Sequence, residues 1–255
     1  MKYPASLRRT SFIISAFALL CLIVLSVSAW YPSTTHYQNN PPEILNKTQS
    51  LQAISLVQNG DDFVLALKNN SNKPINGYSI AIGQHSKLTS DLTAGDRVIA
   101  HGEVAEEKIP ISQLQVTSSG HPQRQQIIVL AVLFEDHSNE GDSTTISAIE
   151  NRRLGVKQQL NRIYPLLESA ASLLNSDKSN PLTKLKSQLS ALPEEPEIGS
   201  SPYVRFGLRE AKEDVLIQVQ KLEQDNADIQ EKVAKLRDKT KKRVDRLRKS
   251  IEKAQ

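Results

Sequence analysis

Cysteine is nearly absent from this chain of 255 residues, since Cys21 is the only one. The chain therefore cannot form an intrachain disulfide, which excludes the small, disulfide-stapled folds of secreted proteins. Aromatic residues are also scarce, at 5% of the sequence. Any folded domain must therefore be held together mainly by packing of aliphatic side chains.

Sequence signatures of catalysis are missing as well. The chain has no Gly-x-Ser-x-Gly motif, no phosphate-binding glycine loop and no His-Glu-x-x-His motif. His101-Gly-Glu103 begins like a zinc deaminase signature, but no Pro-Cys-x-x-Cys follows it. We therefore expect a protein that is not an enzyme and that binds no cofactor.

The amino-terminal region has the pattern of a membrane anchor. Residues 1–10 carry Lys2, Arg8 and Arg9, and residues 11–30 contain no charged side chain. As a helix, this uncharged run nearly matches the hydrocarbon thickness of a bilayer. The positive-inside rule keeps residues 1–10 in the cytoplasm, so we expect a single span and an extracytoplasmic carboxy-terminal part.

A cleaved signal peptide is the alternative interpretation of the same run. Val27-Ser28-Ala29 places small residues at the spacing that signal peptidase requires, with cleavage after Ala29. Retention is favoured by the length of the apolar run and by Trp30 and Tyr31, which would lie at the membrane interface. Cleavage would instead release a soluble, secreted protein.

Strand patterns follow a proline-containing stalk, residues 31–47. Between residues 48 and 137, short apolar or alternating runs are separated by turn residues such as Asn59-Gly60-Asp61. About seven strands of this kind predict an antiparallel β-sandwich. The predicted strands are 51–58, 63–67, 78–82, 87–93, 97–100, 103–111 and 126–135.

The segment Phe63-Val-Leu-Ala-Leu-Lys-Asn-Asn-Ser-Asn-Lys-Pro-Ile75, followed by Tyr78-Ser-Ile-Ala-Ile82, resembles the early strands of immunoglobulin-like modules in bacterial envelope proteins. The resemblance covers residues 48–137. It implies a β-sandwich with an adhesive or spacer role and brings no catalytic residue with it. The region lacks the paired cysteines and the tryptophan of antibody-type domains.

Helical periodicity begins after the predicted strands. Residues 144–192 are predicted to be helical, with a turn at 175–181 and a short helix at 182–192. From Ile146 to Leu174 the apolar side chains recur at alternating spacings of three and four, with Arg153 as the one break in the stripe. Pro165 removes a backbone donor and predicts a kink in this segment. Residues 193–202 hold three prolines and predict a rigid loop.

Residues 203–255 read as one long coiled-coil helix with a basic tail. Its heptad positions predict an interaction surface made of Val219, Leu222, Asn226, Ile229, Val233 and Leu236. The seam can pair with a second copy, giving a homo-oligomer, or fold back on the 146–174 stripe within one chain. We favour the intrachain bundle, because a complementary stripe is tethered nearby.

The basic tail carries seven more positive than negative charges between Lys235 and Lys253, and includes Lys241, Lys242 and Arg243. Such a surface can attract anionic lipids or an acidic envelope polymer. Nucleic acid is not an expected partner, because no aromatic residue lies among these charges to stack on bases.

An acidic loop follows the last predicted strand. Asp136, Ser138, Glu140 and Asp142 alternate as the oxygen ligands of an EF-hand loop do, with Gly141 in the sixth place. The twelfth position is Ser147 instead of the required glutamate. The pattern is therefore more typical of an acidic turn before a helix than of a metal site.

These observations predict an α+β protein: an N-terminal transmembrane helix, an immunoglobulin-like antiparallel β-sandwich and a C-terminal helical hairpin or coiled coil. The expected function is a non-catalytic, membrane-anchored structural or interaction protein of the cell envelope. The alternative is a secreted ligand- or metal-binding protein, or an enzyme with an unrecognised site, after cleavage near Ala29.

Overall fold

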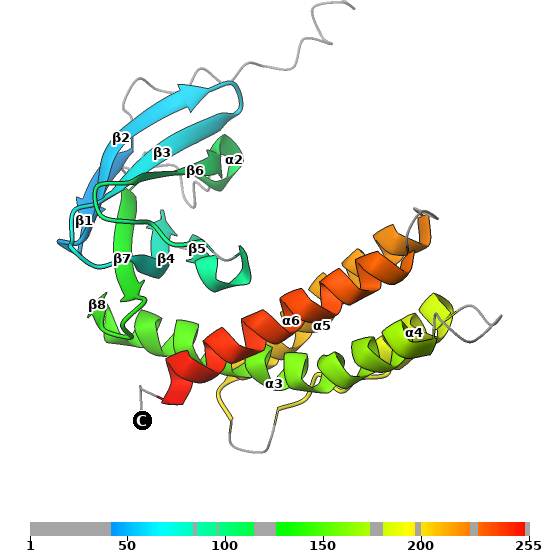
Figure 1. Cartoon of the computed structure of the whole chain (residues 1–255). Coiled ribbons are helices and arrows are strands. Elements are labelled where there is room, and N and C mark those ends of the chain that lie inside the picture. The colour runs from blue at the N-terminus through cyan, green and yellow to red at the C-terminus, as the bar shows by residue number, and fades with distance from the viewer. Residues whose placement is uncertain are drawn as a thin grey trace, which may run out of the picture. The chain divides into compact units, whose positions relative to one another are not determined.

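The computed structural model of the protein describes residues 42–83, 86–95, 97–114, 126–173, 181–196, 200–224 and 229–252. The predicted span, residues 11–30, and most of the predicted stalk lie outside these ranges. Within them, none of the helices combines the length and the apolar character that crossing a membrane requires. Residues 42–255 form one compact unit that contains both the strands and the helices (Figure 1).

Sheet A has the strand order β1-β7-β4-β5, with β8 beside β7. Its strands are β1 (Glu43–Asn46), β4 (Ile75–Ile82), β5 (Ser86–Asp91), β7 (Gln126–Phe134) and β8 (Asn139–Gly141). All pairs are antiparallel except β1 with β7, which is parallel. β7 is buried along almost its whole length, because neighbouring strands flank it and side chains cover both of its faces.

Sheet B has the order β2-β3-β6, with β2 (Leu51–Asn59), β3 (Asp62–Asn69) and β6 (Val104–Pro110). Gly60 and Asp61 connect β2 to β3 in a two-residue hairpin, and Gly60 has a φ of 61°, which glycine adopts without strain. Buried and half-buried residues alternate along β3. Sheet B therefore turns one face to the core and the other to solvent.

The core between the sheets consists of aliphatic side chains from both, with the ring of Tyr78 among them. The Tyr78 hydroxyl donates a hydrogen bond to Glu107 on β6, and so joins sheet A to sheet B. Burial, with a further contribution from the Glu107 hydrogen bond, raises the pKa of Tyr78 well above its ordinary value. The phenol therefore stays a neutral donor across the physiological range.

The strands differ from the predicted set at three places. Residues 43–46, predicted as stalk, form β1, and residues 139–141 of the acidic loop form β8. Residues 97–100, predicted as a strand, contribute only an isolated bridge between Ile99 and Ile75. Strands as short as β1 and β8 owe their existence to pairing with β7, which no local pattern reveals.

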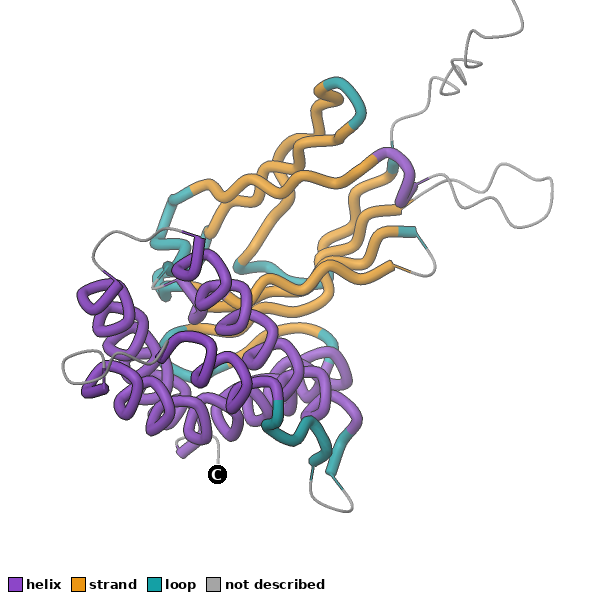
Figure 2. Tube along the Cα trace, turned by 90° about the vertical axis from the view of Figure 1, so that its right-hand side faces the viewer, coloured by secondary structure: helices purple, strands orange, loops and turns teal. Residues whose placement is uncertain are grey.

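Four helices longer than one turn lie in the described carboxy-terminal part: α3 (Ser143–Leu173), α4 (Pro181–Ser190), α5 (Pro202–Gln224) and α6 (Ile229–Glu252). A single turn, α2 (Ile111–Leu114), and a 3-10 turn, η1 (Leu92–Gly95), lie between strands. Figure 2 shows the helices gathered on one side of the strands. α3 runs without interruption through Pro165.

α3 is the centre of the helical bundle, and it packs against α4, α5 and α6. Its buried stripe includes Val156, Leu160, Ile163 and Leu167, which share one core with side chains of the other three helices. This core supplies the burial that an isolated amphipathic helix lacks.

The prediction of one continuous helix over residues 203–255 is wrong. The structure has two helices, α5 and α6, and Arg243 of α6 lies 3.4 Å from Asp214 of α5. In a continuous helix these residues would be separated by about 44 Å, at about 1.5 Å per residue. α6 therefore folds back toward α5 (Figure 1). Both helices bury their apolar stripes against α3 within one chain. The α+β class, with helices following the sheets, is confirmed.

Candidate binding groove

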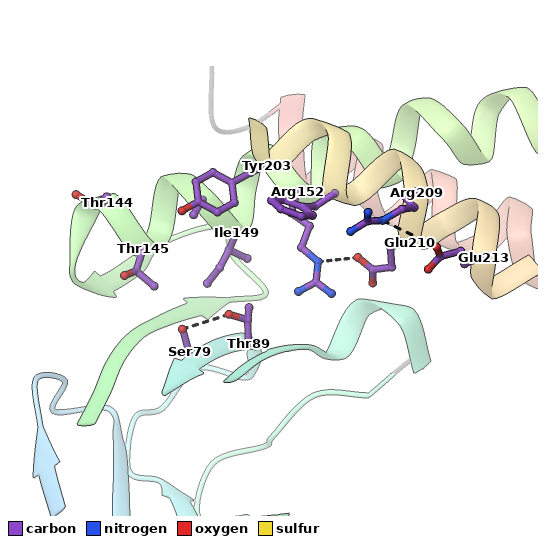
Figure 3. A pocket seen from close by; sticks show the side chains of 12 residues that line it. Ser79, Thr89, Thr144, Thr145, Ile149, Arg152, Tyr203, Arg209, Glu210 and Glu213 are labelled. Carbon is purple, nitrogen blue, oxygen red and sulfur yellow. Dashed lines mark hydrogen bonds and ion pairs between the residues drawn. The ribbon is translucent and has the colours of Figure 1, made fainter. Parts of the chain in front are cut away.

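A groove of about 390 Å³ lies between the outer face of sheet A, the first turns of α3 and the first half of α5 (Figure 3). Its volume falls in the range of small-molecule sites, about 300–1,000 Å³. Sheet A supplies the floor and the two helices supply the walls. It is lined by Ser79, Thr89, Thr144, Thr145, Ala148, Ile149, Arg152, Tyr203, Phe206, Arg209, Glu210 and Glu213.

Two hydroxyl groups form the floor of the groove. Ser79 of β4 and Thr89 of β5 are paired in the sheet register, so their side chains lie on the same face. Their oxygens are 3.3 Å apart, and Ser79 is fully buried. Ser79 Oγ also donates to the Leu88 carbonyl oxygen, so the half-buried Thr89 hydroxyl is the floor group within reach of a ligand.

Two aromatic side chains form one wall. Pro202 begins α5, and Tyr203 and Phe206 follow at a spacing of three, which places both on one helical face. They are 42% and 50% exposed, with ring centroids 6.3 Å apart and planes inclined by 47°. Together they give the groove a contiguous apolar wall, and contiguous exposed apolar surface is one mark of an interaction site.

The charged side chains of the groove face one another in pairs. Arg152 Nε lies 2.6 Å from Glu210 Oε2, joining α3 to α5, and Arg209 lies 3.9 Å from Glu213 and covers the Phe206 ring at 5.4 Å. Two arginines and two glutamates balance, so the groove carries no net charge.

Close helix packing sets the shape of the groove. A Cβ atom on Gly155 of α3 would lie 2.0 Å from the Val204 carbonyl oxygen, and one on Gly207 of α5 would lie 2.0 Å from the Arg152 carbonyl oxygen. The two backbones therefore touch where these glycines meet. This contact brings the first turn of α5, with its aromatic side chains, beside Arg152.

Behind the groove, a buried ion pair fastens α3 to sheet A. Arg153 Nη2 donates to Asp91 Oδ1 at 3.0 Å and to two oxygens of Asn76, and Arg153 is 3% exposed. The guanidinium occupies the space that a side chain on Gly77 would need, since a Cβ there would lie 2.7 Å from Nη2. Arg153, the break in the predicted apolar stripe, is thus the link between helix and sheet.

The charge of Asp91 is held by its surroundings. Burial alone would raise the pKa of this carboxyl, but the Arg153 charge and hydrogen bonds from Thr93 outweigh it and keep the pKa below its ordinary value. The charge of Asp91 also acts on Arg246 of α6: burial lowers the pKa of this guanidinium, and the Asp91 charge opposes that shift.

The predicted interaction residues of the last helix lie mostly inside the bundle. Val219, Val233 and Leu236 are buried, Leu222 and Ile229 are partly buried against the same core, and Asn226 lies outside the described residues. Lys241 and Lys242 are exposed. Arg243 is only 7% exposed and points toward Glu210 and Asp214 of α5.

The acidic loop does not bring its four predicted ligands together. Asp136 binds Lys73 and Ser138, the Glu140 carboxylate accepts backbone hydrogen bonds from Gln49 and Ser50, and Asp142 accepts from Thr145 at the start of α3. The Lys73 hydrogen bond is the main reason that the pKa of Asp136 falls to about 2. Among the residues that the structure describes, no cluster of three or more His, Cys, Asp and Glu side chains is placed to hold a metal ion.

Sequence reasoning missed every residue of the groove. The one local signal was the spacing of Tyr203 and Phe206 directly after Pro202, in a chain with few aromatic residues. The partners across the groove are about 50 and 120 residues away in sequence, and no pattern joins them. No protein family model matches the chain, and neither does any curated protein or solved structure.

Proposed function

We propose that the chain is a non-catalytic interaction protein of the cell envelope, anchored in the membrane by residues 11–30, with its folded unit outside the cytoplasm. The support for the anchor is the uncharged run itself and the basic residues that precede it. The folded unit begins at Pro42, which leaves a stalk of about ten residues between it and the bilayer.

The observation that carries the contact role is the groove with its exposed aromatic wall. Tyr203 and Phe206 offer apolar surface to a partner, and the half-buried Thr89 hydroxyl offers a hydrogen bond. Because the arginines and glutamates already neutralise one another, a partner of strong single-sign charge would gain little by entering. The groove therefore suits a neutral, hydrogen-bonding segment with an apolar part.

We further propose that residues 48–137 form an immunoglobulin-like module. The strand order supports this, because the chain passes back and forth between the sheets: β2 and β3 lie in sheet B, β4 and β5 in sheet A, β6 in sheet B and β7 in sheet A. Such modules present binding surfaces at a distance from a membrane. The exposed Lys241 and Lys242 on α6 add a basic surface that suits an anionic envelope component.

Cell fractionation with intact-mass measurement tests the anchor. The proposal expects the full mass from Met1 in the membrane fraction, and digestion of the folded unit by protease added outside the cytoplasmic membrane. A soluble chain whose mass corresponds to a start at Trp30 would contradict the anchor. It would indicate a secreted ligand-binding protein that uses the same groove.

Site-specific photocrosslinking in the intact envelope tests the groove. A crosslinking residue at Phe206 is compared with one at Ile217, which is equally exposed on the same helix but outside the groove. We expect an adduct of defined mass at position 206 and none at position 217. Equal labelling at both positions would rule out the groove as the contact site.

A further inference from the structure

Asparagine precedes glycine at two places in this chain, Asn59-Gly60 and Asn76-Gly77. This dipeptide is prone to spontaneous deamidation, because glycine has no side chain to hinder attack of its backbone nitrogen on the asparagine amide carbon. The reaction also requires that nitrogen to turn toward the asparagine side chain, and a backbone held in a sheet resists this movement. The fold therefore decides which of the two sites can react.

The first pair lies at the exposed tip of the β2–β3 hairpin. Asn59 is the last residue of β2, and it is exposed and paired with Asp62 beside the turn. Among the described residues, no hydrogen bond holds the Asn59 side-chain amide. Gly60 has open space around it, with no atom within 4 Å of where a Cβ would lie. Local opening costs least at such an end, so the Gly60 nitrogen can reach the side chain without global unfolding.

The second pair lies inside sheet A. Asn76 is 6% exposed, and its side-chain and backbone oxygens accept hydrogen bonds from Arg153 Nη2 at 3.0 and 2.9 Å. Gly77 is paired with Asp91 of β5 on one side and with Leu133 of β7 on the other. Although the guanidinium makes the amide carbon of Asn76 a better electrophile, the attacking nitrogen stays out of reach until the sheet opens.

We propose that Asn59 is a site of spontaneous deamidation in the folded protein and that Asn76 is protected from it. The Gly60 backbone nitrogen loses its proton to hydroxide and attacks the side-chain amide carbon of Asn59, and the amide nitrogen leaves as ammonia. Water then opens the resulting succinimide ring at either of its carbonyl carbons, which gives aspartate or isoaspartate. The reaction consumes only water and depends neither on the membrane anchor nor on the groove.

The modification changes both the charge and the connectivity of the hairpin tip. Asp61 and Asp62 already place two carboxylates there, and the product at position 59 adds a third. Isoaspartate also routes the main chain through the former side chain and lengthens it by one carbon. The Asn59–Asp62 pairing is then disrupted, as it is by an inserted residue in a β-bulge. Because ammonia is lost, the share of modified tips rises with the age of the molecule.

Peptide mapping by mass spectrometry tests the proposal on the full chain, kept folded in detergent at mildly alkaline pH and sampled over days. Exchange of an amide NH2 for a hydroxyl gives a defined mass increment, and chromatography separates the aspartate from the isoaspartate form. We expect Asn59 to react at least about tenfold faster than Asn76, because Asn76 must wait for a much rarer global opening. A ratio below about tenfold would overturn the proposal.

The same chain unfolded in guanidinium chloride is the matched control. Without the fold, both dipeptides have flexible backbones, so the two rates should become similar. A difference that persisted after unfolding would assign it to the flanking sequence and overturn the role of the fold. If unfolding accelerated Asn59 as strongly as Asn76, the hairpin tip would be as protected as the sheet, which would also overturn the proposal.

A pair of variants tests whether Asn59 is the source of the added charge. Asn59→Gln should abolish the acidic species that ion-exchange chromatography resolves in aged samples, because the larger ring that glutamine must form closes far more slowly. Asn72→Gln, at an exposed asparagine in another loop that lysine follows, should leave this species unchanged. An undiminished acidic species in Asn59→Gln would place the modification elsewhere and overturn the assignment.

Discussion

The sheets and the helical bundle of this protein use glycine in opposite ways. In the sheets, Gly60 provides a positive φ at a hairpin and has no atom within 4 Å of where a Cβ would lie. In the bundle, Gly155 and Gly207 lie in ordinary helical segments, but a Cβ on either would lie 2.0 Å from a carbonyl oxygen of the other helix. The first role depends on local conformation and the second depends on contact between distant segments.

The two regions also differ in how they use charge. The core between the sheets is almost entirely apolar, whereas the junction between bundle and sheet A buries the Arg153–Asp91 pair. A buried pair adds little net stability compared with apolar packing, but loss of one partner is costly. The junction is therefore where the molecule is most sensitive to a single change.

The largest effect is expected for Arg153→Met. The substitution keeps an unbranched apolar stem but leaves the Asp91 carboxylate buried without its nearest cation, and it should cost about 3–5 kcal/mol in the free energy of unfolding. Chemical denaturation followed by circular dichroism measures this loss. A loss below about 1 kcal/mol would show that the junction is not a stabilising contact.

The double variant Arg153→Met with Asp91→Asn provides the control and gives a pH dependence. Because the folded pKa of Asp91 lies below its ordinary value, the pair contributes stability above about pH 4 and loses it as the pH falls through the folded pKa. The double variant should be more stable than Arg153→Met alone, because it has no unpaired buried carboxylate. It should also lack the loss of stability at low pH that protonation of Asp91 causes in the wild type. A wild-type and double variant with the same pH profile would contradict this assignment.

The next largest effect compares glycines across the two regions. Gly155→Asn should push α3 and α5 apart and cost about 3 kcal/mol, because the Cβ would meet a backbone oxygen that cannot move independently. Gly60→Asn should cost less than about 1 kcal/mol, because asparagine tolerates a positive φ and the site is open. Thermal unfolding of the wild type and of the two variants measures both losses in stability.

Binding provides a separate readout for the same pair of variants. Since the contact at Gly155 positions the aromatic wall, Gly155→Asn should also weaken crosslinking at Phe206, whereas Gly60→Asn should leave it unchanged. If Gly155→Asn and Gly60→Asn lost similar amounts of stability, the two glycines would not differ as proposed, one serving a positive φ and the other a close contact between helices.

Patterns in the sequence identified most of the strands and all of the helical region, because side-chain alternation and helical periodicity are local properties. The break between α5 and α6 escaped them. The heptad seam from Val219 to Leu236 continues in register across residues 225–228, so the apolar stripe carries no sign of a fold-back. The chain forms two helices because both can then bury their apolar side chains against α3, and this depends on the packing of the whole bundle.

The contacts around the groove also could not be predicted from the sequence, because they join residues that are far apart along the chain. Arg153 looked like a flaw in an apolar stripe because its partners, Asn76 and Asp91, come from strands more than 60 residues earlier. The tail illustrates the same point, since Lys241 and Lys242 remain exposed whereas Arg243 turns inward to α5. A run of like charges does not tell which members face solvent.

A smaller effect is expected at the start of α3, where sheet and helix meet in sequence. The Asp142 side chain accepts hydrogen bonds from the backbone amide and the hydroxyl of Thr145, and so caps the helix. Asp142→Ala should cost about 1 kcal/mol, and Asp142→Asn only part of it, because the amide oxygen can still cap. Thermal unfolding distinguishes the two, and equal losses would mean that the charge alone matters.

The smallest effect is expected at the surface of the sheet module, where Lys73 Nζ lies 2.7 Å from Asp136 Oδ2. Lys73→Met keeps the apolar stem near Phe134 and removes the hydrogen bond that does most to hold the pKa of Asp136 at about 2. The pKa should therefore rise toward its ordinary value of about 3.9, which a carboxyl titration by nuclear magnetic resonance can follow.

Stability should hardly respond to that change, even though the pKa does. Both side chains are about half exposed, so water and salt screen the pair, and the expected loss at neutral pH is below about 0.5 kcal/mol. Because the folded pKa of Asp136 is depressed, any contribution would be present above pH 4 and would disappear as the pH falls toward 2. If Lys73→Met lost as much stability as Arg153→Met, the exposed pair and the buried pair would contribute alike. The surface of the sheets and their junction with the bundle would then not differ in their sensitivity to loss of a charge.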